Sequence, residues 1–189
     1  KRQASRQSRR QNRAPPKPLT QQRFNDMALA YVARFATSAK KLKDYLNRKL
    51  RERGWDEEDG ERPDVDAMVL RYVELGYVDD RIYGEAKARS LSARGYGARR
   101  VEGALRQAGV SDGLRADIGE TLKPRQALLA FAKRRRFGPY SRTEPDEKTV
   151  QKQTAAMMRA GHSFDHVRKL MQAVSGSELE AEWQDDDTL

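Results

Sequence analysis

The 189-residue chain contains no cysteine. This absence excludes disulfides, thiolate zinc sites and cysteine nucleophiles, and it favours a reducing cytoplasm. Only two histidines are present and aromatic residues make up 7% of the chain, so metal sites and base-stacking platforms have few candidate residues. The sequence has neither a run of about 18 apolar residues nor an apolar signal segment near its start. We therefore expect a soluble, cytoplasmic protein without membrane contact.

Basic residues exceed acidic ones, giving a formal net charge of +10 and a pI near 9.9. Such a chain favours polyanionic partners, either nucleic acid or an acidic protein surface. Residues 1–23 carry eight bases and no acid, whereas residues 177–189 carry six acids and no base. Removing these eight bases and six acids leaves +8 on the residues between them. Basic character therefore belongs to the folded part of the chain as well as to its first segment.

The two ends of the chain are predicted to lack stable tertiary structure. Residues 1–23 consist mainly of Arg, Gln, Ser and Pro with almost no apolar residues, a composition typical of disorder. Residues 177–189 are acidic and poor in core residues, with Trp183 as the large apolar anchor. We expect a loose acidic tail there, in which a short helix carries Trp183.

Between the ends, apolar residues recur at helical spacing nearly everywhere, and no run alternates as a strand would. Glycine and proline interrupt these stripes where helices should stop. The pattern predicts an all-α body of about nine helices. One stripe comprises Val65, Met68, Val69, Tyr72, Val73 and Leu75, and others run over Leu42 to Leu50, Val101 to Ala108 and Phe164 to Val174.

A helix terminus closed by glycine occurs three times, at Gly54, Gly109 and Gly161, which lie 55 and 52 positions apart. This spacing accommodates three short helices per unit, and we place the units at residues 24–77, 78–122 and 123–176. Units of this kind bury their faces against one another in a row. We therefore predict three tandem three-helix repeats in an elongated crescent. A single compact bundle is the alternative, and the radius of gyration would separate the two.

Residues 75–86 read Leu-Gly-Tyr-Val-Asp-Asp-Arg-Ile-Tyr-Gly-Glu-Ala. This string predicts a helix ended by Gly76, two apolar residues, Tyr77 and Val78, that tuck under it, and a cap on the next helix from Asp79 or Asp80. The same string resembles the Gly-Tyr-Ile-Asp-Asp hallmark of the RecX family of bacterial recombination regulators. Further similarities over 28–42, 92–110, 133–138 and 160–164 follow in the family's order, so the resemblance covers about 27–174.

Some positions depart from the family pattern. Lys41 stands where members usually have Glu, which removes the reciprocal capping contact to Ser38. Ile82 stands where an aromatic residue is common, and residues 151–154 are unusually polar. These departures bear on partner contacts and leave the expected fold unchanged.

The resemblance implies a non-enzymatic regulator of the RecA recombinase in DNA repair, recombination and the SOS response. Such a protein would act as a monomer that lodges in the groove of the RecA filament on single-stranded DNA. There it would hinder strand exchange, ATP turnover and filament growth. Helices are about 10 Å across, so three units in line would reach roughly 60–75 Å, enough to bridge neighbouring filament subunits.

Clusters of basic residues are the candidate contacts to the filament, to single-stranded DNA and to duplex DNA. A single charge run is most often a solvated helix face, but four clusters on a basic body favour phosphate contacts. Aromatic residues near them are few, so base-specific reading of a strand is not expected. The candidates are Lys40, Lys41 and Lys43; Arg48, Lys49, Arg51 and Arg53; Arg94, Arg99 and Arg100; and Lys133, Arg134, Arg135 and Arg136.

No group of side chains in the sequence has the pattern of a catalytic or cofactor site. His162 and His166 lie four apart but lack a third ligand, so a helix-end histidine and a surface histidine are favoured over a metal pair. Residues 95–97, Gly-Tyr-Gly, lack a third glycine and a preceding strand, which indicates a turn and not a nucleotide loop. Asp79 and Asp80 suit a helix cap better than a Mg²⁺ site or an acid–base pair. We predict no enzymatic activity and no cofactor.

Two other functional classes remain open from the residues themselves. An independent DNA-binding protein would use one unit as a helix-turn-helix against duplex DNA, although no helix stands out by Asn, Gln or Arg at base-reading positions. A scaffold for acidic proteins would require no nucleic acid. The first would bind bare duplex with a sequence preference and a steep salt dependence.

Overall fold

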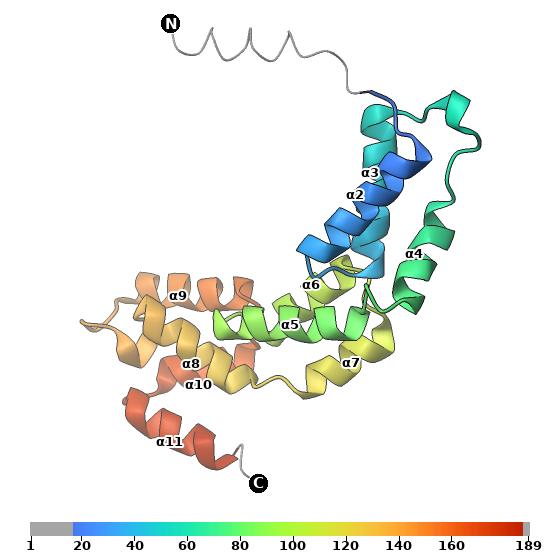
Figure 1. Cartoon of the computed structure of the whole chain (residues 1–189). Coiled ribbons are helices and arrows are strands. Elements are labelled where there is room, and N and C mark those ends of the chain that lie inside the picture. The colour runs from blue at the N-terminus through green and yellow to red at the C-terminus, as the bar shows by residue number, and fades with distance from the viewer. Residues whose placement is uncertain (1–16, 187–189) are drawn as a thin grey trace, which may run out of the picture. The chain divides into compact units, whose positions relative to one another are not determined.

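A computed structural model describes residues 17–186, with side chains described as far as residue 184, and the structural statements below concern this part of the chain. It contains ten α-helices and two short 3₁₀ helices, with no strand (Figure 1). The all-α prediction is confirmed, with one helix more than the nine expected. The chain divides after Asp79 into two compact units, which we describe separately. The first unit holds α2 (Gln21–Arg34), α3 (Ala39–Arg53), η1 (Glu57–Asp59) and α4 (Val65–Glu74), and the second holds α5 (Asp80–Ala93), α6 (Ala98–Gln107), α7 (Asp112–Glu120), α8 (Pro124–Arg135), η2 (Gly138–Tyr140), α9 (Glu147–Arg159), α10 (Phe164–Gln172) and α11 (Gly176–Asp186).

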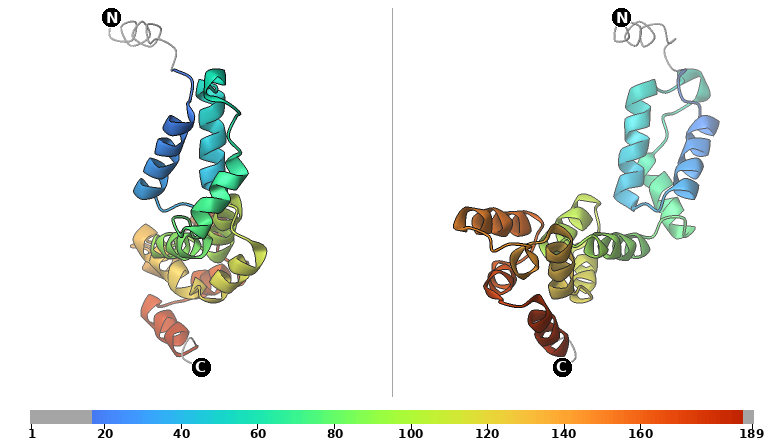
Figure 2. Two further views of the ribbon diagram at one scale, coloured as in Figure 1. Left: turned by 45° about the vertical axis from the view of Figure 1, so that its right-hand side comes forward. Right: turned by 90° about the vertical axis from the view of Figure 1, so that its left-hand side faces the viewer.

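The first unit packs α2 and α4 against α3, and Figure 2 shows α2 and α3 side by side. Ser38 begins α3 because its hydroxyl accepts a hydrogen bond from Lys41 N at 3.3 Å, and Gly54 ends it with a φ of 74°. The buried face of α3 repeats every four residues, which places all its apolar side chains on one side of the helix. The core of this unit comprises Leu19, Phe24, Ala28, Leu42, Leu46, Leu50, Val69 and Val78.

Residues 17–23, predicted to be disordered together with the rest of 1–23, are part of this fold. Leu19 is fully buried, and its backbone exchanges hydrogen bonds with Gly54 O and Asp56 N at 3.1 and 3.0 Å. Thr20 then caps α2 by accepting from Arg23 N at 3.3 Å. The prediction was wrong here because Leu19 is buried and hydrogen-bonds to the backbone of Gly54 and Asp56, which are distant in sequence. Local composition does not reveal such contacts. Residues 1–16 lie outside the described residues.

The second unit has two hydrophobic clusters, and the half-buried Tyr96 packs against both. One lies among α5, α6 and α7, and the other among α8, α9, α10 and α11. The first cluster comprises Tyr83, Ala88, Leu91, Val101, Leu105, Ala108, Val110 and Ile118, and the second Leu128, Phe131, Ala132, Met157, Ala160, Val167, Leu170, Leu179 and Trp183.

Two turns of the second unit cross in backbone contact, and we call this contact the glycine crossing. Gly97 N donates to Ala160 O at 2.9 Å, and Arg99 N donates to Gly161 O at 3.2 Å. A β-carbon at Gly161 would lie 2.5 Å from Arg100 N, and one at Gly97 would overlap the carbonyl of Gly161. Both positions therefore require glycine, and the turn between α5 and α6 is held against the turn between α9 and α10.

Helix α11 stands where a loose acidic tail was expected over 177–189. Trp183 does lie on a helix, but it is only 2% exposed, and it packs with Leu179 in the core that α8 and α10 share. Leu179 and Trp183 are four residues apart, so they project from one face of the helix. The prediction of a loose segment was wrong as far as Asp186, because Leu179 supplies a second apolar anchor that the acidic composition obscured. Residues 187–189 lie outside the described residues.

Candidate functional site

The basic side chains of α3 lie among acidic partners. Lys40 Nζ lies 2.6 Å from Asp44 Oδ2, and Lys43 Nζ lies 2.5 Å from Asp66 Oδ1 on α4. These pairs lower the positive charge that this part of the helix presents. The side chain of Lys41 is exposed to solvent.

The second half of α3 shares one carboxylate between two bases. Lys49 Nζ and Arg48 Nε lie 2.6 and 3.6 Å from the carboxylate of Glu52. The hydrogen bond from Lys49 holds the pKa of Glu52 below its ordinary value. Both cations also lie over the ring of Tyr45. Lys41 and Arg51 are exposed, and Arg53 donates to Lys17 O at 3.1 Å. Four of the seven predicted contact residues of this helix thus pair with acids.

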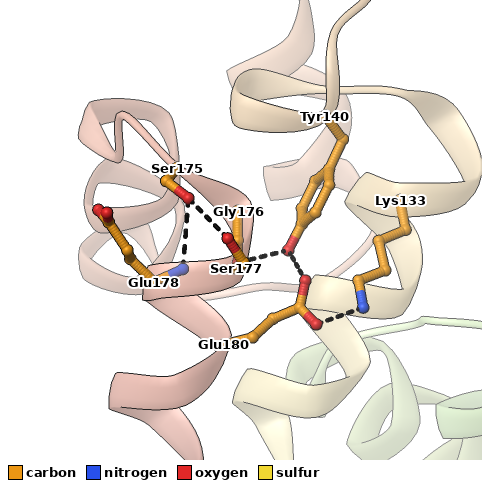
Figure 3. A network of polar contacts seen from close by, with 7 residues as sticks. All are labelled: Lys133, Tyr140, Ser175, Gly176, Ser177, Glu178 and Glu180. Carbon is orange, nitrogen blue, oxygen red and sulfur yellow. Dashed lines mark hydrogen bonds and ion pairs between the residues drawn. The ribbon is translucent and has the colours of Figure 1, made fainter.

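The run from Lys133 to Arg136 divides between different surroundings, since successive helical residues point about 100° apart. Lys133 Nζ lies 2.6 Å from Glu180 Oε2 on α11, and Tyr140 donates its hydroxyl hydrogen to Glu180 Oε1 at 2.7 Å (Figure 3). The Lys133 contact holds the pKa of Glu180 below its ordinary value, while burial and then the Glu180 contact raise the pKa of Tyr140. Lys133 thus links α8 to α11, and its charge is already paired with that of Glu180.

The other three residues of the run, Arg134, Arg135 and Arg136, differ in their contacts. Arg134 and Arg135 place their guanidinium carbons 5.9 and 5.7 Å from the centroid of the Phe131 ring. Arg134 also donates to Arg94 O at 2.6 Å. Arg136 ends α8 in the left-handed conformation, with a φ of 57°, and is exposed.

Tyr96 orders two further predicted arginines. The guanidinium carbons of Arg94 and Arg100 lie over its ring, 5.4 and 4.8 Å from the centroid. Cation–π contacts of this kind hold a long side chain near one position without neutralising its charge. Arg99 is exposed, and its backbone N belongs to the glycine crossing.

Four arginines from three helices line one concave site of about 530 Å³, which we call the arginine depression. They are Arg100 at the start of α6, Arg134 and Arg135 at the end of α8, and Arg159 at the end of α9. No acidic residue lines the site, and within residues 17–184 none of the four arginines has a carboxylate at ion-pair distance. The remaining lining residues are Tyr96, Phe131, Ala156 and Ala160.

The depression brings together three predicted contact residues, Arg100, Arg134 and Arg135, and adds Arg159. Arg159 escaped prediction because it stands alone in the sequence, outside every basic run. The signal that could have found it is its place two residues before Gly161, whose turn contacts the turn that precedes Arg100.

The comparisons with known proteins identify the family of this chain. No family model matches the sequence. The chain is 30% identical over 166 residues to the regulatory protein RecX of Myxococcus xanthus, and the match covers 82% of this chain and 88% of that protein. The chain belongs to the RecX family. It is also 34% identical over 136 residues to RecX of Agrobacterium fabrum, covering 70% and 72% of the two chains, and 34% identical over 161 residues to RecX of Thermobifida fusca, covering 82% and 80%.

Solved RecX structures share the fold of this chain. The crystal structure of RecX from Lactobacillus salivarius superposes with a TM-score of 0.60 at 17% identity, covering 81% of this chain and 95% of that one. A second crystal structure of regulatory protein RecX gives a TM-score of 0.58 at 19% identity, covering 79% and 69%. At these identities the likeness extends to the fold alone.

The RecX hallmark segment closes the first unit. Gly76 has a φ of 73°, and the backbone N of Tyr77 and of Val78 donates to Tyr72 O at 3.0 and 3.2 Å. Val78 is buried as predicted, but Tyr77 is 56% exposed and rests against the ring of Tyr72. Both residues therefore fold back onto α4 as predicted, but only Val78 is buried, because the ring of Tyr77 packs on Tyr72 at the surface. Helix α5 begins at Asp80.

Both histidines of this RecX-family chain pack inside the second unit. His162 is 2% exposed and its Nε2 lies 3.0 Å from Gly95 O, next to the glycine crossing. His166, expected at the surface, is half-buried with its ring 5.9 Å from that of Trp183. Burial is the main cause that lowers the pKa of each. Across the described residues, no group of three potential ligands is placed to hold a metal ion, and no helix is long and apolar enough to cross a membrane.

A larger cavity of about 710 Å³ lies among α5, α7 and α8. Four of the five charged residues in its lining pair with each other: Arg81 with Asp117 at 2.9 Å, and Arg89 with Glu85 at 3.7 Å. Its apolar lining consists of four alanine side chains together with Ile118 and Leu122. The cavity therefore offers little unpaired charge to a polyanion, in contrast to the arginine depression.

Proposed function

We propose that this protein regulates a RecA recombinase by binding the RecA filament on single-stranded DNA. In this role it slows ATP turnover, strand exchange and filament growth without catalysing a reaction itself. Its membership in a family of regulatory proteins supports the regulatory role. The observation that carries the contact is the arginine depression, a concave surface with four arginines and no acid.

The pairing of charges ranks the two units as contact surfaces. To bind a polyanion, the bases of α3 must first leave Asp44, Glu52 and Asp66, and these exposed ion pairs weakly oppose the exchange. The arginines of the depression have no such competitor among the described residues. We therefore place the main contact with the filament on the second unit and a weaker one on α3.

The test is the ATPase and strand-exchange activity of RecA on single-stranded DNA with this protein added below stoichiometric amounts. We expect both activities to fall, since a protein that blocks filament growth acts on more subunits than it contacts. Absence of any effect on either activity would refute the proposal.

A charge reversal at Arg134 and Arg135 tests where the filament is contacted. Arg134→Glu with Arg135→Glu should raise the concentration needed for inhibition, because two repulsive charges replace two attractive ones. Lys133 is left intact, since it fastens Glu180. The matched control reverses Arg89 and Arg106, which lie outside the depression and each pair with a glutamate one helical turn away. Equal loss in both variants would show that net charge, and not this surface, governs the contact.

A further inference from the structure

We propose that the arginine depression is a binding site for the phosphate groups of a nucleic-acid strand. This chain binds the sugar–phosphate backbone of the strand and not its bases, and it does so without RecA. The inference rests on the proposed function, which brings the protein to single-stranded DNA. All residues that line the site belong to the second unit. The inference names the ligand chemistry of that site, which the regulatory role leaves unspecified.

The first argument is the number and type of charges. Four guanidinium groups surround about 530 Å³ with no acid among the lining residues. So dense a positive site is matched by a ligand with at least two negative charges close together. A nucleic-acid strand provides one charge per nucleotide, and the arginine fork suits two oxygens of one phosphate.

The second argument is the hydrogen-bonding character of the lining. Arginine side chains only donate, and the phenylalanine and alanine side chains neither donate nor accept. Phosphate groups only accept, so they match this surface. A bound acidic peptide would also bring backbone N–H groups, for which Tyr96 alone among the lining side chains carries an acceptor oxygen. The lining thus favours phosphates over carboxylates on a peptide.

The third argument is that three of the four arginines are held in place before a ligand binds. Arg100 lies over Tyr96, and Arg134 and Arg135 lie over Phe131. The glycine crossing holds the start of α6, which carries Arg100, against the turn that follows Arg159. Side chains that are already ordered lose less conformational entropy on binding.

The same contacts determine what the site does not read. The rings of Tyr96 and Phe131 are both engaged by guanidinium groups, so they are poor platforms for stacked bases. Recognition through phosphates alone is independent of base sequence. A strand that lacks its bases should therefore bind about as well as a normal one.

The experiment measures fluorescence anisotropy of a dye-labelled oligothymidylate with the full chain, without RecA, over a range of salt concentrations. Each phosphate contact on a single strand contributes about 0.7 to the slope of log K against log salt, or roughly fivefold in affinity at ~0.1 M salt. Arg100→Gln with Arg159→Gln should thus weaken binding about 25-fold and lower the slope by about 1.4. The control, Arg89→Gln with Arg106→Gln, removes the same charge outside the depression and should leave both values nearly unchanged.

Tyr96 is a positioning residue under this proposal. Tyr96→Phe keeps a ring beneath Arg94 and Arg100 and should retain the affinity, whereas Tyr96→Leu removes the ring and should weaken binding severalfold. Helicity by circular dichroism and the emission of Trp183 verify that each variant is folded. Equal affinities in folded Tyr96→Phe and Tyr96→Leu would overturn the positioning role.

Two competing ligands test the chemistry of the site. An abasic strand of the same length should compete equally with oligothymidylate, and polyglutamate of the same charge should compete poorly. Abasic competition weakened more than tenfold would overturn backbone-only recognition. Polyglutamate that competes equally would overturn the assignment to phosphate. Because RecA is absent, these results are distinct from the ATPase test: strand binding without inhibition of RecA would refute only the proposed function.

Discussion

Replacement of Gly161 by alanine tests the glycine crossing, on which the arginine depression depends. The added β-carbon would lie 2.5 Å from Arg100 N and 2.7 Å from Arg100 Cβ. The backbone at Gly161 also has a φ of +94°, which residues with a β-carbon rarely adopt. The substitution thus disturbs the crossing in two ways, by strain within residue 161 and by overlap with α6.

The magnitude follows from these two effects. A positive φ costs a residue with a β-carbon about 1–2 kcal/mol, and inserting one carbon into a tightly packed contact costs about 1–3 kcal/mol. If the turns separate to relieve the overlap, they lose the hydrogen bonds from Gly97 N and Arg99 N, each worth about 0.5–1.5 kcal/mol. We expect Gly161→Ala to lower the free energy of unfolding of the second unit by about 2–5 kcal/mol.

Gly54→Ala is the matched control. Gly54 closes α3 with a φ of +74°, but a β-carbon there would meet nothing within 4 Å. With a ψ of 174°, this backbone conformation is nearly confined to glycine, so we expect the substitution to cost the first unit a conformational penalty of about 1–3 kcal/mol without any overlap. The difference between the two variants isolates the overlap at the crossing.

Urea unfolding followed by tryptophan emission measures both variants, because each unit contains one tryptophan, Trp55 or Trp183. Trp55→Phe leaves Trp183 to report the second unit for Gly161→Ala, and Trp183→Phe leaves Trp55 to report the first unit for Gly54→Ala. If the two glycine variants lose the same free energy, the crossing is not a tight contact and the reasoning fails.

Three further predictions concern the second unit. The pKa of Glu180 lies below its ordinary value of 4.5 because Lys133 donates a hydrogen bond to its carboxylate. The stabilisation from this contact is therefore present above about pH 4.5 and is lost as the pH falls through the pKa of the folded state. Acidification should shift the emission of Trp183, and Glu180→Gln should abolish that shift. Burial lowers the pKa of His162 below its ordinary value of 6.5, so the fold loses stability as the pH falls below 6.5. His162→Gln should reduce the dependence of the urea midpoint on pH. A wild-type midpoint that does not change with pH would contradict this. Trp183→Ala should cost about 3–5 kcal/mol in thermal or urea unfolding, whereas a loss below about 1 kcal/mol would mean that α11 is not part of the core.

Features that depend on neighbouring residues in sequence could be predicted. Gly54, Gly76 and Gly161 each follow a helix with a positive φ, as their places after apolar stripes indicated. Helix caps are equally local: Asp64 and Asp146 accept hydrogen bonds from backbone N–H groups at the starts of α4 and α9. Both kinds of signal act within about one helical turn, so they are written in adjacent residues.

Features that depend on distant partners could not be predicted. Lys133 and Arg134 are adjacent in sequence, yet one pairs with Glu180 and the other lines the depression. Arg159 reaches the site from a helix with no basic cluster. Three of the four arginines of the depression belong to the predicted basic runs, while tertiary packing decides which side chains converge. The tandem three-unit organisation and its crescent form stay predictions, and so does the main contact with RecA.

The contact between His162 and Gly95 joins residues 67 positions apart. Chains emerge from the ribosome at about 5–20 residues per second, so roughly 3–13 s pass between the appearance of the two partners. During that interval the turn after α5 has neither the imidazole of His162 nor the carbonyl of Ala160 to bind. The second unit consequently completes its fold only after residue 162 has emerged, and a nascent chain halted before residue 160 should expose this turn to proteases and chaperones.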